Sequence, residues 1–142
     1  MENREFNPTL VKEIMLFNQQ ISDLQLKILT TYQLTLSHFN LLLYLKEKSP
    51  LSLKQLTHLT QTEKSTLSRQ VTNLMAQQWL MKEQTLDKRV YLIHLTSEGL
   101  EKLAKIDIEF NDTWKTLFSA WPEDEQQLLF ILLGRINRNF KN

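Results

Sequence analysis

Hydroxyl and basic side chains recur at helical spacing in the segment EKSTLSRQVTNLMAQQ, which begins at Glu63. Intervals of three, four and seven residues place Ser65, Ser68 and Thr72 on one helix face, opposite apolar side chains. Such groups donate to phosphates and base edges, and no acid on this face repels a polyanion. The alternative is an ordinary solvated helix face. The candidate DNA-binding residues here are Lys64, Ser65, Thr66, Ser68, Arg69 and Thr72.

A charged tip, Leu86-Asp87-Lys88-Arg89, follows between two segments rich in aromatic and branched residues. Residues 79–85 and 90–95 are therefore predicted strands, and the hairpin they form is a wing. The tip contains no Gly, so a type I turn or a longer connection is expected rather than a two-residue primed turn. Lys88 and Arg89 are further candidate DNA contacts.

Capping signals predict the helices that position these two surfaces. Thr35 can cap a helix over 36–48, whose apolar residues nearly encircle it. Ser52 and Gln55 have capping-box spacing, which predicts a short helix over 53–59. Thr60 or Thr62 can cap the next helix, which begins near Glu63. A short helix, a tight turn and a second helix with a polar outer face form a helix-turn-helix.

Long amphipathic helices are predicted at both ends of the chain. The first begins with Asn7 as its cap and carries a heptad seam, which pairs with a second subunit or packs on its own domain. A later helix, capped by Thr96, has an apolar stripe that Asp107 interrupts. Asp107 either lies at a solvent-exposed edge of the stripe or contacts a ligand or a partner subunit. A last helix begins at Pro122. The heptad seam of the first helix consists of Leu10, Ile14, Phe17, Ile21, Leu24 and Ile28.

Composition narrows the possible functions. The 142 residues include no Cys, which excludes disulfides and thiolate metal sites. No apolar run approaches the roughly 20 residues of a membrane span, so we expect a cytoplasmic protein without membrane association. Residues 50–95 hold six basic and three acidic side chains, which favours a polyanionic partner for this part.

Metal, cofactor and enzyme functions have little support. His38, His58 and His94 fall on separate elements and have no ligand-spaced partners. No phosphate-binding Gly loop and no nucleophile with an evident base occur. We therefore expect no metal site, no cofactor and no catalysis.

The order of elements and the string DKRVYLIHLTSEG resemble the MarR family of winged helix-turn-helix transcriptional regulators. The family pattern D-x-R, five residues, L-T-x-x-G matches Asp87, Arg89, Leu95-Thr96 and Gly99. The stretch KSTLSRQVTNL is similar to the family's recognition helix. Two positions depart from the family, which usually has Gly at Gln78 and an apolar residue at Thr62.

The resemblance implies a mainly α fold with a small β-hairpin wing. It implies a dimerisation helix in 1–34, a DNA-binding winged helix-turn-helix in 35–96 and further dimerisation helices in 97–142. The homodimer would bind double-stranded DNA at a pseudo-palindromic operator, with Arg89 in the minor groove and Asp87 holding it in place.

The resemblance also suggests regulation by a ligand. A repressor released by a small aromatic or phenolic molecule is expected, with Phe17, Tyr32, His38 and Trp114 as candidate lining residues. These aromatic side chains could equally belong to the core. The main alternative function is a helical protein–protein adaptor whose winged-helix core no longer binds DNA.

Overall fold

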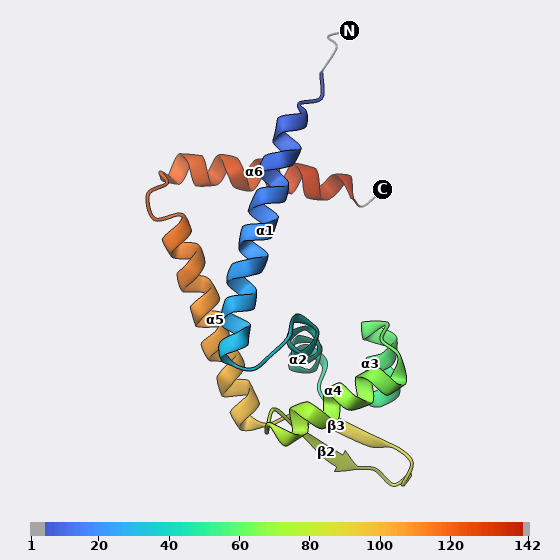
Figure 1. Cartoon of the computed structure of the whole chain (residues 1–142). Helices are drawn as coiled ribbons and strands as arrows, with labels where there is room; N and C mark the ends of the chain where they lie inside the picture. Colours follow the sequence, from blue (N-terminus) through green and yellow to red (C-terminus); the bar gives the residue numbers. More distant parts are fainter. Residues whose placement is uncertain (1–4, 141–142) are drawn as a thin grey trace. The chain divides into compact units, whose positions relative to one another are not determined.

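We describe residues 5–140 of the protein from a computed structural model, whose helices and strands are labelled in Figure 1. The chain divides into two compact units between Asp107 and Ile108. The N-terminal unit contains α1 (Pro8–Thr31), α2 (Leu36–Lys48), β1 (Leu51–Ser52), α3 (Leu53–Thr60), α4 (Lys64–Ala76), β2 (Leu80–Gln84), β3 (Tyr91–Leu95) and the start of α5 (Ser97–Leu117). The C-terminal unit contains the remainder of α5 and α6 (Glu123–Asn139).

The helix α1 begins as predicted, because the Asn7 side chain accepts a hydrogen bond from the Thr9 N–H and Pro8 is the first helical residue. It ends in a Schellman motif, in which Gln33 has a φ of 59° and the Leu34 N–H donates to the Leu29 carbonyl. Leu29 and Leu34 are buried there, so the motif anchors the end of α1 in the core.

The helix-turn-helix comprises α3 and α4. The Ser52 hydroxyl accepts from the Gln55 N–H at 3.2 Å and the Gln55 side chain accepts from the Ser52 N–H at 2.9 Å, which confirms the predicted capping box. The predicted cap of α4 was wrong. Glu63 occupies the N-cap without a side-chain hydrogen bond, while the hydroxyls of Thr60 and Thr62 donate to the backbone carbonyls of Leu56 and Thr60 in α3.

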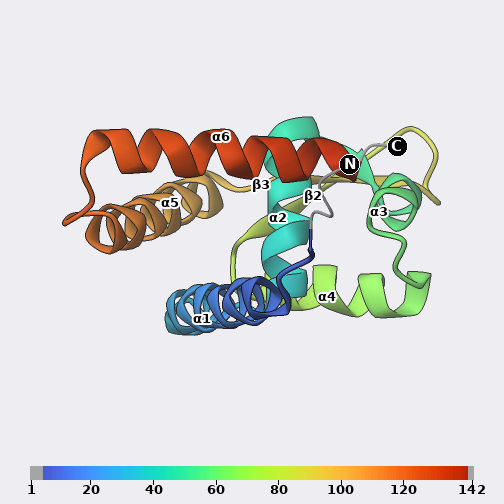
Figure 2. The ribbon, with the colours of Figure 1, turned by 90° about the horizontal axis from the view of Figure 1, so that it is seen from above.

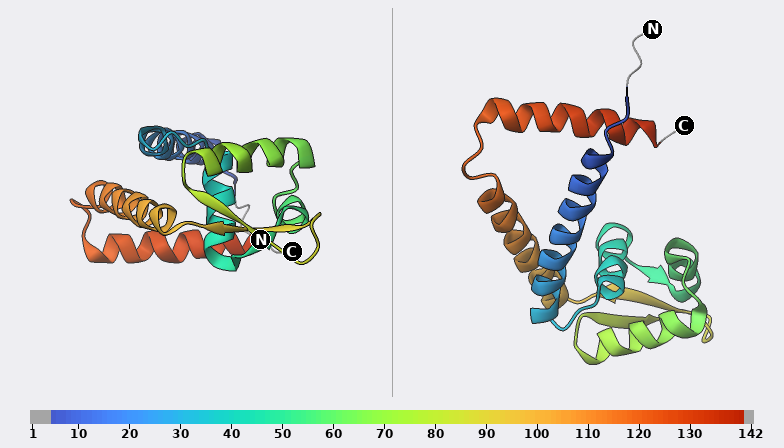
Figure 3. Two further views of the ribbon diagram at one scale, coloured as in Figure 1. Left: turned by 90° about the horizontal axis from the view of Figure 1, so that it is seen from below. Right: turned by 45° about the horizontal axis from the view of Figure 1, so that its top comes forward.

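The wing belongs to a three-stranded antiparallel sheet of order β1-β3-β2. In the hairpin Leu80 pairs with Leu95 and Gln84 with Tyr91, close to the predicted strands. The two-residue β1, which was not predicted, pairs Leu51 with Ile93. The helices α2, α3 and α4 pack beside this sheet (Figure 2, Figure 3).

The core of the N-terminal unit is mostly leucine and is contributed by every helix and strand of the unit. The predicted central role of α2 is confirmed, because Leu41, Leu42 and Leu45 are buried. The remaining buried apolar residues are Leu29, Leu34, Leu51, Leu56, Leu67, Val71, Leu74, Trp79, Leu80, Ile93, Leu103 and Ile106.

The predicted apolar stripe of α5 is buried only in part, since Leu103 is buried whereas Leu100 and Leu117 are 47% and 44% exposed. Ile106 is buried and Asp107 is exposed, so the inward face passes through Ile106 and Asp107 does not interrupt it. In the C-terminal unit, Phe118 stacks on Trp114 and meets Trp121 edge-on. The helix α6 begins one residue later than predicted, with Pro122 as its N-cap, and none of its residues is buried.

Candidate nucleic-acid interface

A groove of about 970 Å³ lies between α3, the start of α4 and the wing, all within the N-terminal unit. Three of the predicted contact residues line it together, Lys64 and Ser68 from α4 and Arg89 from the wing. Lys54 of α3 adds a third cation, and no acidic side chain is among the lining residues. A concave surface whose charged groups are all basic attracts a polyanion and can hold its phosphates.

The outward face of α4 carries the other predicted contacts. Ser65, Arg69 and Thr72 are exposed, whereas Thr66 and Ser68 are half-buried. The Thr72 hydroxyl donates to the Ser68 carbonyl at 2.8 Å, which leaves its oxygen as an acceptor toward a ligand. The buried face of the same helix consists of Leu67, Val71 and Leu74, so α4 is fixed with its polar side outward.

The wing tip is a tight turn held by side chains. The Val90 N–H donates to the Asp87 carbonyl at 3.0 Å, and neither Lys88 nor Arg89 has a positive φ, as the predicted type I turn requires. The Asp87 carboxylate accepts from the Arg89 backbone N–H at 3.0 Å. Asp87 therefore orders the backbone of Arg89 through this hydrogen bond, rather than forming a salt bridge with its guanidinium. The Thr85 hydroxyl bonds the Val90 carbonyl at 2.7 Å and closes the hairpin.

Sequence reasoning missed several residues of this surface. Lys54 and His58 lie four residues apart on α3 and both line the groove. That spacing was a usable signal, because it places both on one helix face. Tyr91 also lines the groove, with the Lys82 ammonium 4.5 Å from its ring centroid. Leu86 at the wing tip is fully exposed.

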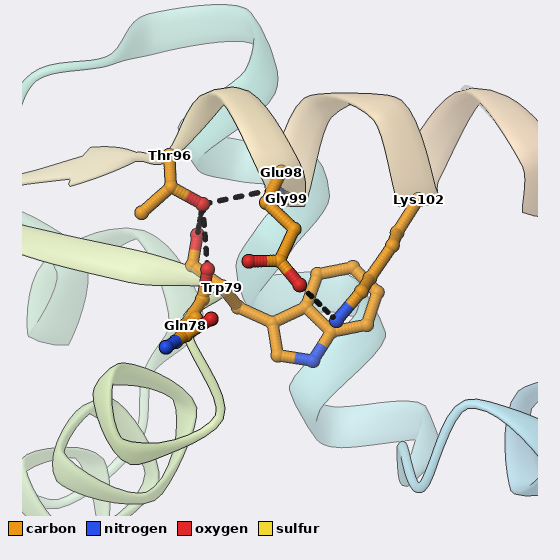
Figure 4. A network of polar contacts seen from close by, with 6 residues as sticks. All are labelled: Gln78, Trp79, Thr96, Glu98, Gly99 and Lys102. Atoms are coloured by element: carbon orange, nitrogen blue, oxygen red, sulfur yellow. Dashed lines mark hydrogen bonds and ion pairs between the residues drawn. The ribbon is translucent and has the colours of Figure 1, made fainter.

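The end of α4 is fixed to the start of α5 by Thr96 and Gly99, two residues that match the MarR pattern (Figure 4). The Thr96 hydroxyl donates to the Gln78 carbonyl at 2.6 Å, and its oxygen accepts from the Gly99 N–H at 2.9 Å. A Cβ on Gly99 would lie 2.6 Å from the Trp79 carbonyl oxygen, so only Gly fits. The Lys102 ammonium lies 5.0 Å from the Trp79 ring centroid and 3.1 Å from Glu98.

The two departures from the MarR pattern have different consequences. Gln78 has a φ of 66°, the left-handed conformation that Gly adopts most easily. The turn nevertheless forms, with the Trp79 N–H donating to the Leu74 carbonyl at 2.9 Å. Thr62 is half-buried, and its hydroxyl donates to the Thr60 carbonyl at 3.3 Å.

The candidate ligand residues are distributed over both units. Phe17 lies on α1, Tyr32 at its C-cap and His38 in the first turn of α2, while Trp114 belongs to the C-terminal unit. The His38 Nδ1 accepts from the Thr35 N–H at 3.4 Å, and burial lowers the pKa of this imidazole. Tyr32 lines a groove of about 370 Å³ with Gln77, Trp79 and Lys102. A shared ligand site for the four aromatic residues stays a prediction.

Two further observations concern metals and membranes. Within residues 5–140, no group of three or more His, Asp or Glu side chains is arranged to hold a metal ion, and His94 pairs with Glu83 on the wing. Among the helices of the described residues, none combines the length and apolarity needed to cross a bilayer.

A helix-turn-helix followed by an antiparallel hairpin and a long helix defines the winged helix-turn-helix class of proteins. The chain belongs to the SarA/Rot family of transcriptional regulators, whose family model, "Transcriptional regulator SarA/Rot", matches residues 23–106. This is a family of regulators and not of enzymes. No curated protein matches the sequence.

Solved structures with this fold include MarR-family proteins, which confirms the predicted resemblance and fold class. YusO from Bacillus subtilis has a TM-score of 0.84 at 17% identity, covering 94% of this chain and 99% of its own. A MepR mutant from S. aureus has a TM-score of 0.84 at 18% identity, with coverages of 95% and 99%. Wild-type MarR from E. coli has a TM-score of 0.69 at 22% identity, with coverages of 93% and 98%.

Proposed function

We propose that this regulator binds double-stranded DNA sequence-specifically as a homodimer and acts as a repressor. The observation that carries the proposal is the groove in which Lys54, Lys64 and Arg89 converge with no acidic neighbour among the lining residues. The exposed face of α4 would enter the major groove, where hydroxyl and guanidinium groups can bond to base edges. Arg89 on the wing would reach the adjacent minor groove, whose negative potential attracts guanidinium groups.

Dimerisation would be mediated by the segments 1–34 and 97–142, of which the structure describes residues 5–34 and 97–140. On α1, Leu10, Ile14 and Phe17 of the heptad seam are 55%, 45% and 48% exposed. On α6 the large apolar residues are exposed as well, including Phe130 at 71%. So many exposed large apolar side chains on a helix are rare on monomers and typical of subunit interfaces. A twofold dimer would present two copies of α4 to a pseudo-palindromic operator.

Release by a small aromatic or phenolic ligand is the regulatory part of the proposal. Its support is the groove at Tyr32, which includes Gln77 at the C-cap of α4 and the cation Lys102 of α5. A carboxylate or phenolate would compete with Glu98, 3.1 Å from the Lys102 ammonium, for that cation, while its ring contacts Tyr32 and Trp79. Such a ligand would act on the residues that fix the end of α4.

Selection of bound sequences from a random duplex pool tests the proposal directly. We expect an enriched pseudo-palindrome whose half-sites lie about one helical turn apart. Fluorescence anisotropy on that duplex should show the logarithm of the association constant falling linearly with the logarithm of salt concentration, with a slope of roughly −0.9 per neutralised phosphate. If no sequence is enriched and every duplex binds only in the millimolar range at low salt, the proposal is wrong and the adaptor function takes its place.

A further inference from the structure

A second groove of the N-terminal unit lies away from the wing, between α2, the α3–α4 turn and the inner flank of α4. Its volume is about 450 Å³, which suits a small molecule. Its polar lining includes Asn40, Tyr44 and Glu47 from α2, Thr60 and Thr62 from the turn region, and Gln70 from α4. None of these residues belongs to the candidate DNA contacts.

This groove is lined by an acidic residue and no basic one, whereas the groove beside the wing is lined by basic residues and no acidic one. Glu47 is the one charged residue that lines it, and neither of the ion pairs found between described side chains involves Glu47. An anionic ligand would therefore meet an uncompensated carboxylate, whereas a cation would gain a charge-assisted hydrogen bond.

The hydroxyl groups of the groove also favour a ligand that donates hydrogen bonds. The Thr60 hydroxyl donates to the Leu56 carbonyl at 2.7 Å, and the Thr62 hydroxyl donates to the Thr60 carbonyl at 3.3 Å. Each hydroxyl has one hydrogen, so both oxygens can only accept from a ligand. The side chains of Glu47, Thr60 and Thr62 therefore all require a hydrogen-bond donor on the ligand.

The remaining wall accommodates an apolar body. Leu41, which is almost completely buried, and Leu43 line the same groove beside the ring of Tyr44. A phenol ring can cover either an alkyl chain or an aromatic ring, and its face also attracts a cation. Amide groups of Asn40 and Gln70 can donate or accept, and so fit either edge of a ligand.

We infer that this groove binds a small organic cation, an ammonium or amidinium group on an apolar body. The cationic N–H groups would donate to the Glu47 carboxylate and the Thr60 and Thr62 oxygens, and the body would lie against Leu43 and Tyr44. Because the lining spans α2, the helix-turn-helix turn and Gln70, an occupant would bridge α2 to α4. The inference does not depend on DNA binding.

Benzamidinium chloride is a suitable probe, since it combines an amidinium with an aromatic ring. We expect saturable shifts of the Asn40 and Gln70 side-chain amide resonances of the full-length protein in nuclear magnetic resonance spectra, with a Kd of about 1 mM. Glu47→Gln should weaken binding about tenfold, and Thr62→Val by a smaller factor. Glu101→Gln, which removes an exposed acid on α5, is the matched control and should leave the Kd unchanged.

Sodium benzoate has the same shape and the opposite charge, and it should produce no saturable shift at these amides. The inference is overturned if benzamidinium leaves the Asn40 and Gln70 resonances unmoved, if benzoate binds equally well, or if Glu47→Gln binds like wild type. All measurements are made without DNA, so their outcome is separate from that of the operator selection.

Discussion

The hydroxyl of Thr96 donates a 2.6 Å hydrogen bond to the carbonyl oxygen of Gln78, which joins the end of α4 to the cap of α5. The same hydroxyl oxygen caps α5 through the Gly99 N–H. Gln78 reaches this position only by adopting a φ of 66°. The helix that carries most of the candidate DNA contacts is therefore anchored at its C-terminus by a strained residue and one shared hydroxyl.

Replacing Gln78 with Gly should stabilise the protein. A side chain in the left-handed region costs about 1 kcal/mol, and the greater freedom of Gly in the unfolded chain cancels part of the gain. We expect Gln78→Gly to raise the free energy of unfolding by about 0.5 kcal/mol, measured by urea denaturation. The neighbouring Gln77 has a φ of −89°, so Gln77→Gly should lower stability instead. Equal changes at both positions would contradict this explanation.

Gly99→Ala should destabilise the protein, because the added methyl group would lie 2.6 Å from the backbone carbonyl oxygen of Trp79. Moving α5 away to relieve the contact would weaken its cap at Thr96, at a cost of about 1–3 kcal/mol. Thermal unfolding measures the loss. In Gly134→Ala the new methyl group would meet only the end of the Arg138 side chain at 3.3 Å, so this helical control should be neutral or stabilising. Similar losses in both variants would remove the steric explanation.

The sequence predicted the parts of the fold that depend on local chemistry. Asn7, Ser52 and Thr96 cap the helices at which they were placed, because a side-chain acceptor beside free N–H groups acts within a few residues. The Thr60 and Thr62 prediction was wrong because neither residue occupies the N-cap: α4 begins at Lys64, so the cap falls on Glu63, while Thr60 still belongs to the last turn of α3.

The features that sequence reasoning missed depend on tertiary structure. Positive φ occurs at three glutamines, Gln33, Gln61 and Gln78. Gln has no backbone preference for the left-handed region, so the residue type does not predict this conformation. The strand β1 is too short to show alternation and exists because Leu51 pairs with Ile93. The spacing of Lys54 and His58 marks a shared helix face, but only folding places that face of α3 beside the wing, where both line the groove with Arg89.

Stability should depend on pH through His38. Burial lowers the pKa of its imidazole from the usual 6.5, and the neutral Nδ1 accepts the Thr35 N–H in a capping box. The unfolded chain therefore binds the proton more readily, so this contribution is present above about pH 6.5 and is lost as pH falls. His38→Gln keeps a capping-box residue that does not titrate, and should lose less stability between about pH 7 and pH 5. If the free energy of unfolding, measured by urea denaturation, depends on pH identically in wild type and His38→Gln, His38 is not the source of the pH dependence.

Placing a charge in the exposed seam of α1 should dissociate the proposed dimer. Ile14 is 45% exposed in the single chain, and in a dimer Ile14→Asp would bury an unpaired carboxylate. Analytical ultracentrifugation should then show a folded monomer at concentrations where wild type is dimeric. Asn18→Asp, an exposed position on the same helix outside the seam, is the control and should remain dimeric. A dimer that survives Ile14→Asp would exclude the seam from the interface.

Arg89 should contribute to DNA affinity without contributing to stability. It is exposed at the wing tip, and the Asp87 carboxylate fixes its backbone, so its guanidinium is free to reach a groove at little entropic cost. Arg89→Ala should weaken binding to the selected duplex by about 1–3 kcal/mol in fluorescence anisotropy, with the dimer and the melting temperature unchanged. Asp87→Ala should produce part of this loss, because the turn then loosens. Lys105→Ala removes an exposed cation from α5, away from the groove, and should bind like wild type. If Lys105→Ala weakens binding as much as Arg89→Ala does, the wing adds only general positive charge and the minor-groove contact is wrong.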